Sequence, residues 1–187
     1  MKFEKVADVV DLYRQCGEHM YDEEVSQTTH AVQCARRAQG DGASADLALA
    51  ALLHDVGHLL EIRAQESAHV VTEKDLRHQD SGSHALSNLF GPLVTEPIRW
   101  HVEAKRFLCA TDSEYAGSLS AGSTASLALQ GGPMTADECT QFLAQPQSAD
   151  AIRLRRWDDL GKDTENSPSS IDEFEHLLYL FVGELDN

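Results

Sequence analysis

Apolar residues recur every three or four positions in three stretches of the chain, residues 3–13, 31–38 and 47–56. This spacing places apolar side chains on one face of an α-helix, so each stretch predicts an amphipathic helix. Gly57 follows the third stretch and is expected to end that helix, because glycine is favoured at helix C-termini. No stretch shows the alternation of apolar and polar residues that is typical of a half-buried strand.

Three further helices are predicted by residues that are typical of helix starts. A proline suits the first turn of a helix over 97–107. Thr135 and Glu138 have the spacing of a capping box, which predicts a short helix ending at Leu143. Ser170 precedes two acidic residues and is expected to open a last helix that ends near Leu185.

Two polar stretches, 61–79 and 161–169, lack helical periodicity and predict loops. The chain of 187 residues is long enough for one compact domain with a hydrophobic core. It contains no internal repeat and no low-complexity tract. We therefore expect an all-α fold with a single domain over residues 1–187.

The charge balance narrows the classes of partner. With 31 acidic and 15 basic residues the formal net charge is -16, which argues against a nucleic-acid surface, because phosphate backbones need dense clusters of Lys and Arg. No apolar stretch reaches the length of about 18 residues that a membrane helix needs, and the N-terminus lacks a signal peptide. We expect a soluble, cytoplasmic protein with reduced, partly buried thiols. The cysteines are Cys16, Cys34, Cys109 and Cys139.

His54 and Asp55 stand together at the end of an apolar stretch and are candidates for metal binding. A buried imidazole beside a buried carboxylate is costly unless the two are hydrogen-bonded, paired or bound to a metal. Asp55 is placed to bridge two ions. The alternative is a core histidine beside a capping aspartate, and this dipeptide alone does not decide between them.

Further metal-competent residues lie before and after this His-Asp pair along the chain. Imidazole and carboxylate without thiolate suit iron, manganese or zinc. His19, His69 and His176 fit no ligand position, and His84 competes with His78 for one of the four histidine places. The candidate residues in chain order are His30, His54, Asp55, His78 or His84, His101 and Asp158.

This order of residues resembles the HD-domain superfamily, in the variant whose dinuclear site uses four histidines and two aspartates. The resemblance favours His78 over His84, because Gly82 then matches a glycine of that family and His84 becomes a surface residue. The metal ligands that the resemblance implies are His30, His54, Asp55, His78, His101 and Asp158.

Three basic side chains lie one helical turn from a proposed ligand and so share its face. In an acidic protein they would form a positive pocket suited to a phosphate or phosphonate group. They are Lys105, four residues after His101, Arg155, three before Asp158, and His58, four after His54. The hydroxyls of Ser123 and Ser126 stand at a predicted helix start, which also favours an anion.

The residues before His30 are acidic and aromatic, unlike the basic residues near the other candidate ligands. Tyr21 and Glu23 offer an aromatic ring and a carboxylate, which together can hold an ammonium group. Glu23 lies two helical turns before His30 and faces the same cavity if that helix is continuous. An acidic helix start explains the same residues equally well.

The match extends to three longer segments, His-Val-Glu-Ala-Lys-Arg at 101–106, Gln-Gly-Gly-Pro-Met at 130–134 and Arg-Arg-Trp-Asp at 155–158. With them, residues 20–162 resemble PhnZ-type enzymes, which are HD-domain oxygenases with a mixed-valent Fe(II)/Fe(III) pair. These enzymes use O2 to cleave a 1-hydroxyphosphonate to a carboxylic acid and phosphate. The resemblance implies two iron ions, a small phosphonate substrate and a separate hydroxylase that installs the C1 hydroxyl.

The resemblance also implies roles for individual residues. The phosphonate would be held by His58, Lys105, Ser123, Ser126 and Arg155. Glu23 occupies the position near the substrate amine. The family tyrosine that shields the open iron aligns with Met20, so Tyr21 departs from the pattern by one place. We expect Tyr21, Glu23, His58 and Lys105 to take part in catalysis.

The resemblance, together with the acidic and aromatic character near Tyr21, favours (1R)-1-hydroxy-2-(trimethylammonio)ethylphosphonate as substrate, with glycine betaine and phosphate as products. The primary amine, 2-amino-1-hydroxyethylphosphonate, which gives glycine, is the alternative. The alternative hypotheses for the function are an HD phosphohydrolase without a redox step, an inositol-oxygenase-like enzyme and a catalytically inactive binding module. The oligomeric state does not follow from the sequence.

Overall fold

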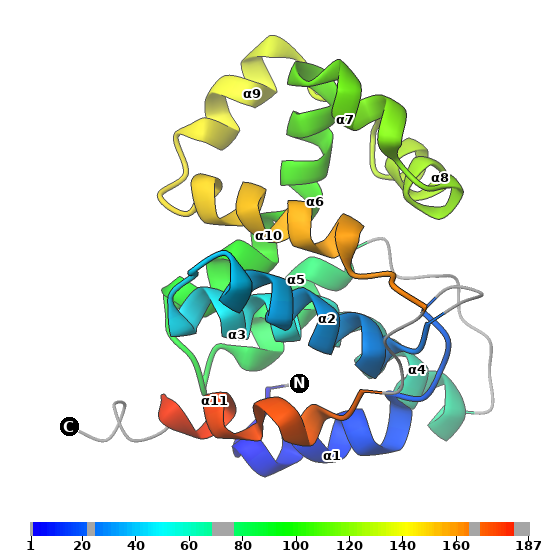
Figure 1. The fold of residues 1–187 in the computed structure, drawn as a ribbon, viewed down its shortest axis with the longest axis vertical. Helices are drawn as coiled ribbons and strands as arrows, with labels where there is room; N and C mark the ends of the chain where they lie inside the picture. The colour runs from blue at the N-terminus through cyan, green and yellow to red at the C-terminus, as the bar shows by residue number, and fades with distance from the viewer. Residues whose placement is uncertain (1, 22–24, 69–76, 165–168, 182–187) are drawn as a thin grey trace.

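The computed structural model describes residues 2–21, 25–68, 77–164 and 169–181, which form an all-α single-domain fold (Figure 1). The described part of the chain contains no strand, and an isolated β-bridge joins Met20 and Ser26. The predicted fold class is confirmed. In chain order the helices are α1 (Val6–Cys16), α2 (Gln27–Gly40), α3 (Ala45–Leu53), α4 (Val56–Ala68), α5 (His78–Leu86), α6 (Pro92–Thr111), α7 (Ser113–Ser118), α8 (Ala121–Leu129), α9 (Ala136–Leu143), α10 (Ser148–Leu160), the 3-10 helix η1 (Ile171–Phe174) and α11 (Glu175–Leu180).

The long helix α6 connects two parts of the molecule (Figure 1). At one end α1 to α5 and α11 form the main bundle, and at the other α7, α8 and α9 form a smaller group. Helix α10 packs along α6 between the two, and α2 packs on both α3 and α10. The core of the main bundle contains fully buried leucines, and three fully buried histidines, His30, His54 and His101, lie among them. The bundle thus surrounds a polar centre.

Side-chain caps explain where several helices begin. The hydroxyl of Ser26 accepts a hydrogen bond from the backbone N–H of Thr29 at 3.2 Å, so α2 begins at the next residue. Thr135 and Glu138 form the predicted capping box, and α9 ends at Leu143 as expected. Ser120 caps α8, which begins earlier than the serines that had suggested a helix start.

Two predicted helix boundaries are wrong. Gly57 does not end a helix, because α3 has already ended at Leu53 and Gly57 lies in the first turn of α4. Pro97 lies inside α6, whose first residue is another proline, Pro92. The helix continues past Pro97 because the carbonyl left without a donor belongs to Leu93, which is exposed, so water can replace the missing N–H.

The predicted loop over 61–79 is wrong in its first part, because α4 continues to Ala68. Residues 69–76 lie outside the described part of the chain. Ser170 does cap a helical segment, but this segment opens as the 3-10 helix η1 before α11. The expected end near Leu185 falls outside the described residues. Residues 161–164 are not helical, as predicted for the second loop.

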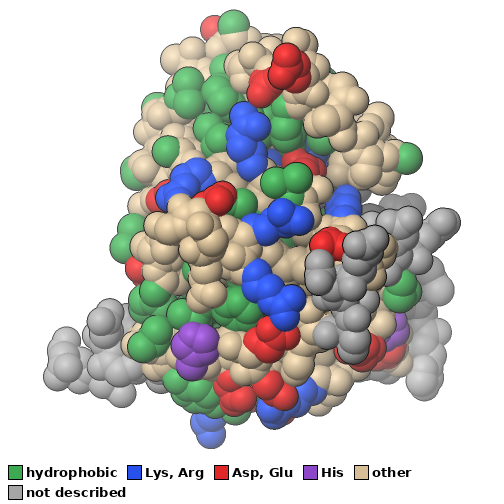
Figure 2. Space-filling view, in the orientation of Figure 1, with side chains coloured by type: hydrophobic (Ala, Val, Ile, Leu, Met, Phe, Trp, Pro, Cys, Tyr) green, Lys and Arg blue, Asp and Glu red, His purple; other side chains and the backbone are tan. Residues whose placement is uncertain are grey.

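On the face in Figure 2, Lys and Arg side chains are interspersed with Asp and Glu rather than gathered into a continuous basic surface. The described helices include none that is both long and apolar enough to cross a membrane.

Candidate metal centre

The structure brings all six predicted metal ligands together in the centre of the bundle. They come from α2, the α3–α4 junction, α5, α6 and α10, and every one of them is buried. Helix packing therefore joins residues that are far apart in the sequence. The six are His30, His54, Asp55, His78, His101 and Asp158.

Four of these side chains form a first group around a common point. The Nε2 atoms of His30 and His54 lie 3.3 Å apart, and His30 Nε2 lies 3.3 Å from Oδ1 of Asp158. His54 Nε2 lies 3.4 Å from Oδ2 of Asp55. Ligand atoms that sit about 2.0–2.2 Å from a first-row metal lie about 3–3.5 Å from one another. The first group therefore has the dimensions of a metal site.

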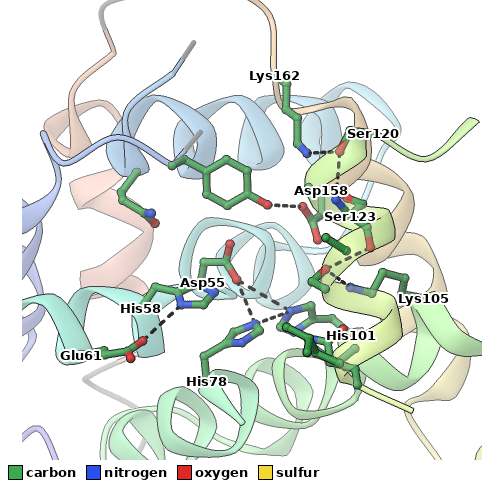
Figure 3. Close-up of a pocket in the computed structure, with 18 of the residues that line it drawn as sticks. Asp55, His58, Glu61, His78, His101, Lys105, Ser120, Ser123, Asp158 and Lys162 are labelled. Carbon is green, nitrogen blue, oxygen red and sulfur yellow. Dashed lines mark hydrogen bonds and ion pairs between the residues drawn. The ribbon is translucent and has the colours of Figure 1, made fainter. Parts of the chain in front are cut away.

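The remaining ligands form a second group around the other oxygen of Asp55 (Figure 3). His78 Nε2 lies 3.1 Å from His101 Nε2 and 3.4 Å from Asp55 Oδ1. His101 Nε2 lies 3.8 Å from the same oxygen. Asp55 thus offers one carboxylate oxygen to each group, which is the arrangement of a bridging ligand between two ions.

Hydrogen bonds behind the imidazoles determine which nitrogen faces the centre. His30 Nδ1 donates to the carbonyl of Gly161 at 2.8 Å, and His54 Nδ1 donates to the carbonyl of Ala51 at 2.9 Å. A carbonyl only accepts, so each Nδ1 carries the proton and each neutral ring has a bare lone pair on Nε2. Two such lone pairs at 3.3 Å repel unless a proton or a metal ion lies between them. The same orientation holds for His101, whose Nδ1 donates to Ile98 at 2.6 Å.

The pKa shifts agree with a centre that attracts positive charge. Burial opposes ionisation of Asp55, but His54 and His78 outweigh it and hold the pKa of this carboxyl well below its usual value. Arg155 and the histidines do the same for Asp158. Burial would lower the pKa of His54, but the two carboxylates raise it to about 9. Burial and the neighbouring histidines lower the pKa of His101 well below its usual value.

Gly161 allows α10 to end directly over His30. A β-carbon at this position would lie 2.5 Å from Cys34 Sγ and 3.2 Å from His30 Nδ1. A side chain here would displace the carbonyl that orients the imidazole. Glycine at position 161 therefore helps to shape the candidate metal centre, although it offers no ligand.

A cavity of about 720 Å³ opens over the metal groups and is closed on the opposite side by α8 (Figure 3). Three cations from α6, α10 and the segment after α10 each donate to one serine on one face of α8. The pairs are Lys105 with Ser126 at 2.8 Å, Arg155 with Ser123 at 3.4 Å and Lys162 with Ser120 at 3.3 Å. This wall of the cavity is suited to an anion.

Lys105 is the most deeply buried lysine of this wall, with 3% of its surface exposed. Burial and the nearby guanidinium of Arg155 lower its pKa to about 8. Among the described residues its hydrogen-bond partner is a hydroxyl, Ser126, which does not neutralise the charge. An anion in the cavity would therefore replace a weak partner with a strong one.

Tyr21 and His58 each cover one metal group. The ring of Tyr21 stacks on His30 with centroids 3.9 Å apart, and its hydroxyl lies 3.4 Å from Oδ1 of Asp158. His58 stacks on His78 at 3.9 Å. Tyr21 therefore reaches the first group despite its shift of one place from the family pattern. The spacing of four residues predicted that His58 and His54 share the face of one helix. This is wrong, because His58 lies on α4 and His54 follows the end of α3.

The helical spacing that placed Glu23 on the same face as His30 is not found. Ser26 has extended backbone angles and α2 begins at Gln27, so no continuous helix carries Glu23 two turns before His30. Glu23 itself lies outside the described residues. His84 is exposed on α5, as expected once His78 is chosen.

Four residues near the centre were not among the predicted site residues. Cys34, one turn after His30, places its sulfur 3.8 Å from His30 Nε2, and burial raises the pKa of this thiol well above its usual value. Lys162 lines the cavity, and Tyr115 and Asp159 surround Arg155. Asp159 and Lys162 follow closely after a predicted ligand, whereas Tyr115 had no signal in the sequence.

The family model described as "HD domain" matches residues 25–163, a range that contains the whole centre. The chain belongs to the HD-domain family. Within this family it is 42% identical over 159 residues to the hydroxymethylphosphonate dioxygenase of Gimesia maris, covering 85% of this chain and 79% of that protein. It is 37% identical over 149 residues to the glycine-betaine-forming [1-hydroxy-2-(trimethylamino)ethyl]phosphonate dioxygenase of Leisingera caerulea, covering 80% and 75%. These relatives place this HD-domain protein with the O2-dependent, PhnZ-like oxygenases, as the resemblance implied.

Proposed function

We propose that this HD-domain protein is a diiron oxygenase that uses O2 to cleave the carbon–phosphorus bond of a 1-hydroxyphosphonate. The observation that supports the metal site most strongly is the Asp55 carboxylate, because its two oxygens face two separate groups of imidazole nitrogens, at 3.4 Å from His54 Nε2 and 3.4 Å from His78 Nε2. Two groups of imidazole and carboxylate that share Asp55 suit a pair of iron ions. Bound iron would supply the redox chemistry with O2, and the products would be a carboxylic acid and phosphate.

The surrounding residues would bind and orient the substrate. Lys105 would contribute the positive charge for the phosphonate, and the hydroxyls of Ser123 and Ser126 would donate to its oxygens in place of their present partners. His58 and Tyr21 would cover the two metal groups and limit the access of water. The C1 hydroxyl would be installed beforehand by a separate hydroxylase.

The identity of the substrate depends on the substituent that C1 carries. The described wall of the cavity favours an uncharged substituent. Lys162 Nζ lies 5.3 Å from the centroid of the Tyr21 ring, which already stacks on His30. A second cation at this ring would be repelled, so it is poorly suited to a trimethylammonio group. We therefore infer hydroxymethylphosphonate, the substrate named for the relative from Gimesia maris, as the first candidate, with formate and phosphate as products.

The trimethylammonio substrate favoured by the sequence is the second candidate. It is supported by the relative from Leisingera caerulea and by Glu61, a carboxylate that lines the cavity on α4, across from the serines of α8 (Figure 3). The primary amine 2-amino-1-hydroxyethylphosphonate, giving glycine, would use the same carboxylate. A phosphohydrolase would need neither iron nor O2 and finds no support in the relatives named above.

The deciding experiment is incubation of iron-reconstituted protein with the three 1-hydroxyphosphonates, with and without air, while phosphate release and O2 uptake are followed together. We expect one O2 consumed per phosphate released, no turnover without air, and the highest kcat/KM for hydroxymethylphosphonate. Phosphate release without O2 uptake would identify a hydrolase. A higher kcat/KM for the trimethylammonio compound would reverse the order of the candidates and leave the oxygenase assignment intact.

A further inference from the structure

The guanidinium of Arg155 is held by carboxylates on two sides. Its Nη1 donates to Oδ2 of Asp158 at 2.5 Å. On the other side, Nε donates to Oδ2 of Asp159 at 3.1 Å, and Nη2 donates to Oδ1 of the same residue, so the two groups form a bidentate fork. Arg155 is 4% exposed. Its orientation is therefore determined by the protein before any ligand arrives.

Tyr115 completes this arrangement from a different helix. Its hydroxyl accepts a hydrogen bond from Arg155 Nε at 3.0 Å and donates one to Asp159 Oδ2 at 2.6 Å. Tyr115 lies on α7 and is 7% exposed, whereas its two partners lie on α10. The short helix α7 is thus tied to α10, which carries the candidate ligand Asp158, through buried polar contacts.

Because of the contact with Arg155, the two carboxylate oxygens of Asp158 have different partners. Oδ2 is occupied by the guanidinium, and Oδ1 lies 3.3 Å from His30 Nε2 and 3.4 Å from the hydroxyl of Tyr21. The carboxylate cannot rotate without breaking its bond to the buried Arg155. A single oxygen of Asp158 therefore points into the first metal group.

The charges around Arg155 indicate that it positions the neighbouring carboxylates more than it attracts an anion. One guanidinium faces two carboxylates, so these three side chains together carry a net negative charge. Among the described side chains of the cavity wall, Lys105 and Lys162 pair with hydroxyls and so keep positive charge for a phosphonate. The predicted role of Arg155 as an anion binder is thus incomplete.

We propose that Tyr115 and Asp159 are positioning residues that lock Arg155, which in turn holds Asp158 so that one oxygen is presented to a metal ion. This inference rests on the proposed function only in requiring that the centre binds metal. Side chains behind a metal ligand commonly change metal affinity 10–100-fold when they are removed, by the order of magnitude known for such contacts.

The test is a titration of the metal-free protein with Mn²⁺, followed by EPR to resolve the two binding steps, for Asp159→Asn and Tyr115→Phe. Asp158→Ala identifies the step that depends on this carboxylate. The matched control is Asp112→Asn, which breaks the exposed 3.2 Å contact of Arg156 with Asp112 between the same two helices and keeps the N-cap of α7. Thermal melts of every variant report whether it folds.

We expect both variants to weaken the Asp158-dependent step by about 10-fold or more, while the other step and the control are unchanged. Asp159→Asn should also bind inorganic phosphate more tightly than the parent protein, because the side chains at 155, 158 and 159 then carry no net negative charge. A merely structural role would weaken both metal steps equally or lower only the melting temperature, and either result would overturn the inference. If Asp159→Asn does not fold, Tyr115→Phe, which removes a single hydroxyl, carries the test. None of these measurements requires turnover, so they stand apart from the test of the proposed function.

Discussion

Gly57 lies directly against the backbone of His78. A β-carbon at position 57 would stand 2.1 Å from the carbonyl oxygen of His78 and 3.0 Å from its Cα, so no other residue fits without moving a helix. Because Gly57 is in the first turn of α4 and His78 is the first residue of α5, this contact sets the distance between the two helices. It allows Asp55, just before α4, to lie 3.4 Å from His78.

Replacement of this glycine should therefore damage both the fold and the metal centre. For Gly57→Ala we expect the free energy of unfolding to fall by about 1–3 kcal/mol, the usual cost of overpacking, and metal content to fall with it. Denaturant unfolding of the metal-free protein and elemental analysis after reconstitution measure the two effects. Gly40→Ala, where an added β-carbon meets no atom within 4 Å, should change neither. Equal behaviour of the two variants would contradict the proposed close contact.

The bridging position of Asp55 predicts a difference in metal stoichiometry. Removal of Asp55 takes one ligand from each group, whereas removal of His101 takes a ligand only from the second. After reconstitution with iron, Asp55→Ala should lose most of both ions, and His101→Ala should keep one. His84→Ala, on the exposed side of α5, should keep both. Loss of iron in His84→Ala would instead return His84 to the ligand set.

Lys105 should matter for substrate and not for iron. A charge-assisted hydrogen bond is worth about 1.5–3 kcal/mol, so Lys105→Ala should raise KM for the phosphonate roughly 10–100-fold with iron content unchanged. Arg99→Ala on the same helix, α6, is the matched control, because Arg99 is half exposed and pairs with Glu96. Steady-state kinetics and iron analysis on the same preparations separate the two effects. A parallel loss of iron and of substrate affinity would show that Lys105 supports the metal centre instead.

The same lysine predicts a pH dependence. Burial and Arg155 lower the pKa of Lys105 to about 8, against the opposing effect of Asp158, Asp159 and Asp55. The ammonium form of Lys105 binds the phosphonate, so KM should be constant below this pKa and should rise about 10-fold per pH unit above it. Bound metal ions add positive charge, which lowers the pKa of the lysine further, so the rise should begin at about pH 8 or below. In Lys105→Arg this rise should disappear, since a guanidinium stays charged. Identical pH profiles for the two proteins would assign the titration to another group.

The helices were predictable where apolar spacing decides them and unpredictable where packing does. The periodic stretches at 31–38 and 47–56 became α2 and α3, since an apolar face must be buried whatever lies opposite. Gly57 was misread because glycine is common at helix ends and also where two backbones meet. Only the position of α5 distinguishes these uses.

For the candidate site, the types of the candidate ligands, their order and the cations near them could be read from the sequence, because these are properties of the residues and of a recurring pattern. Which atoms meet became visible only in the folded protein. It divides the oxygens of Asp55 between two groups and those of Asp158 between a metal group and Arg155. It also brings Tyr115 from α7 to the guanidinium. Such contacts join residues on separate helices, and their geometry depends on how the helices pack, which local spacing does not encode.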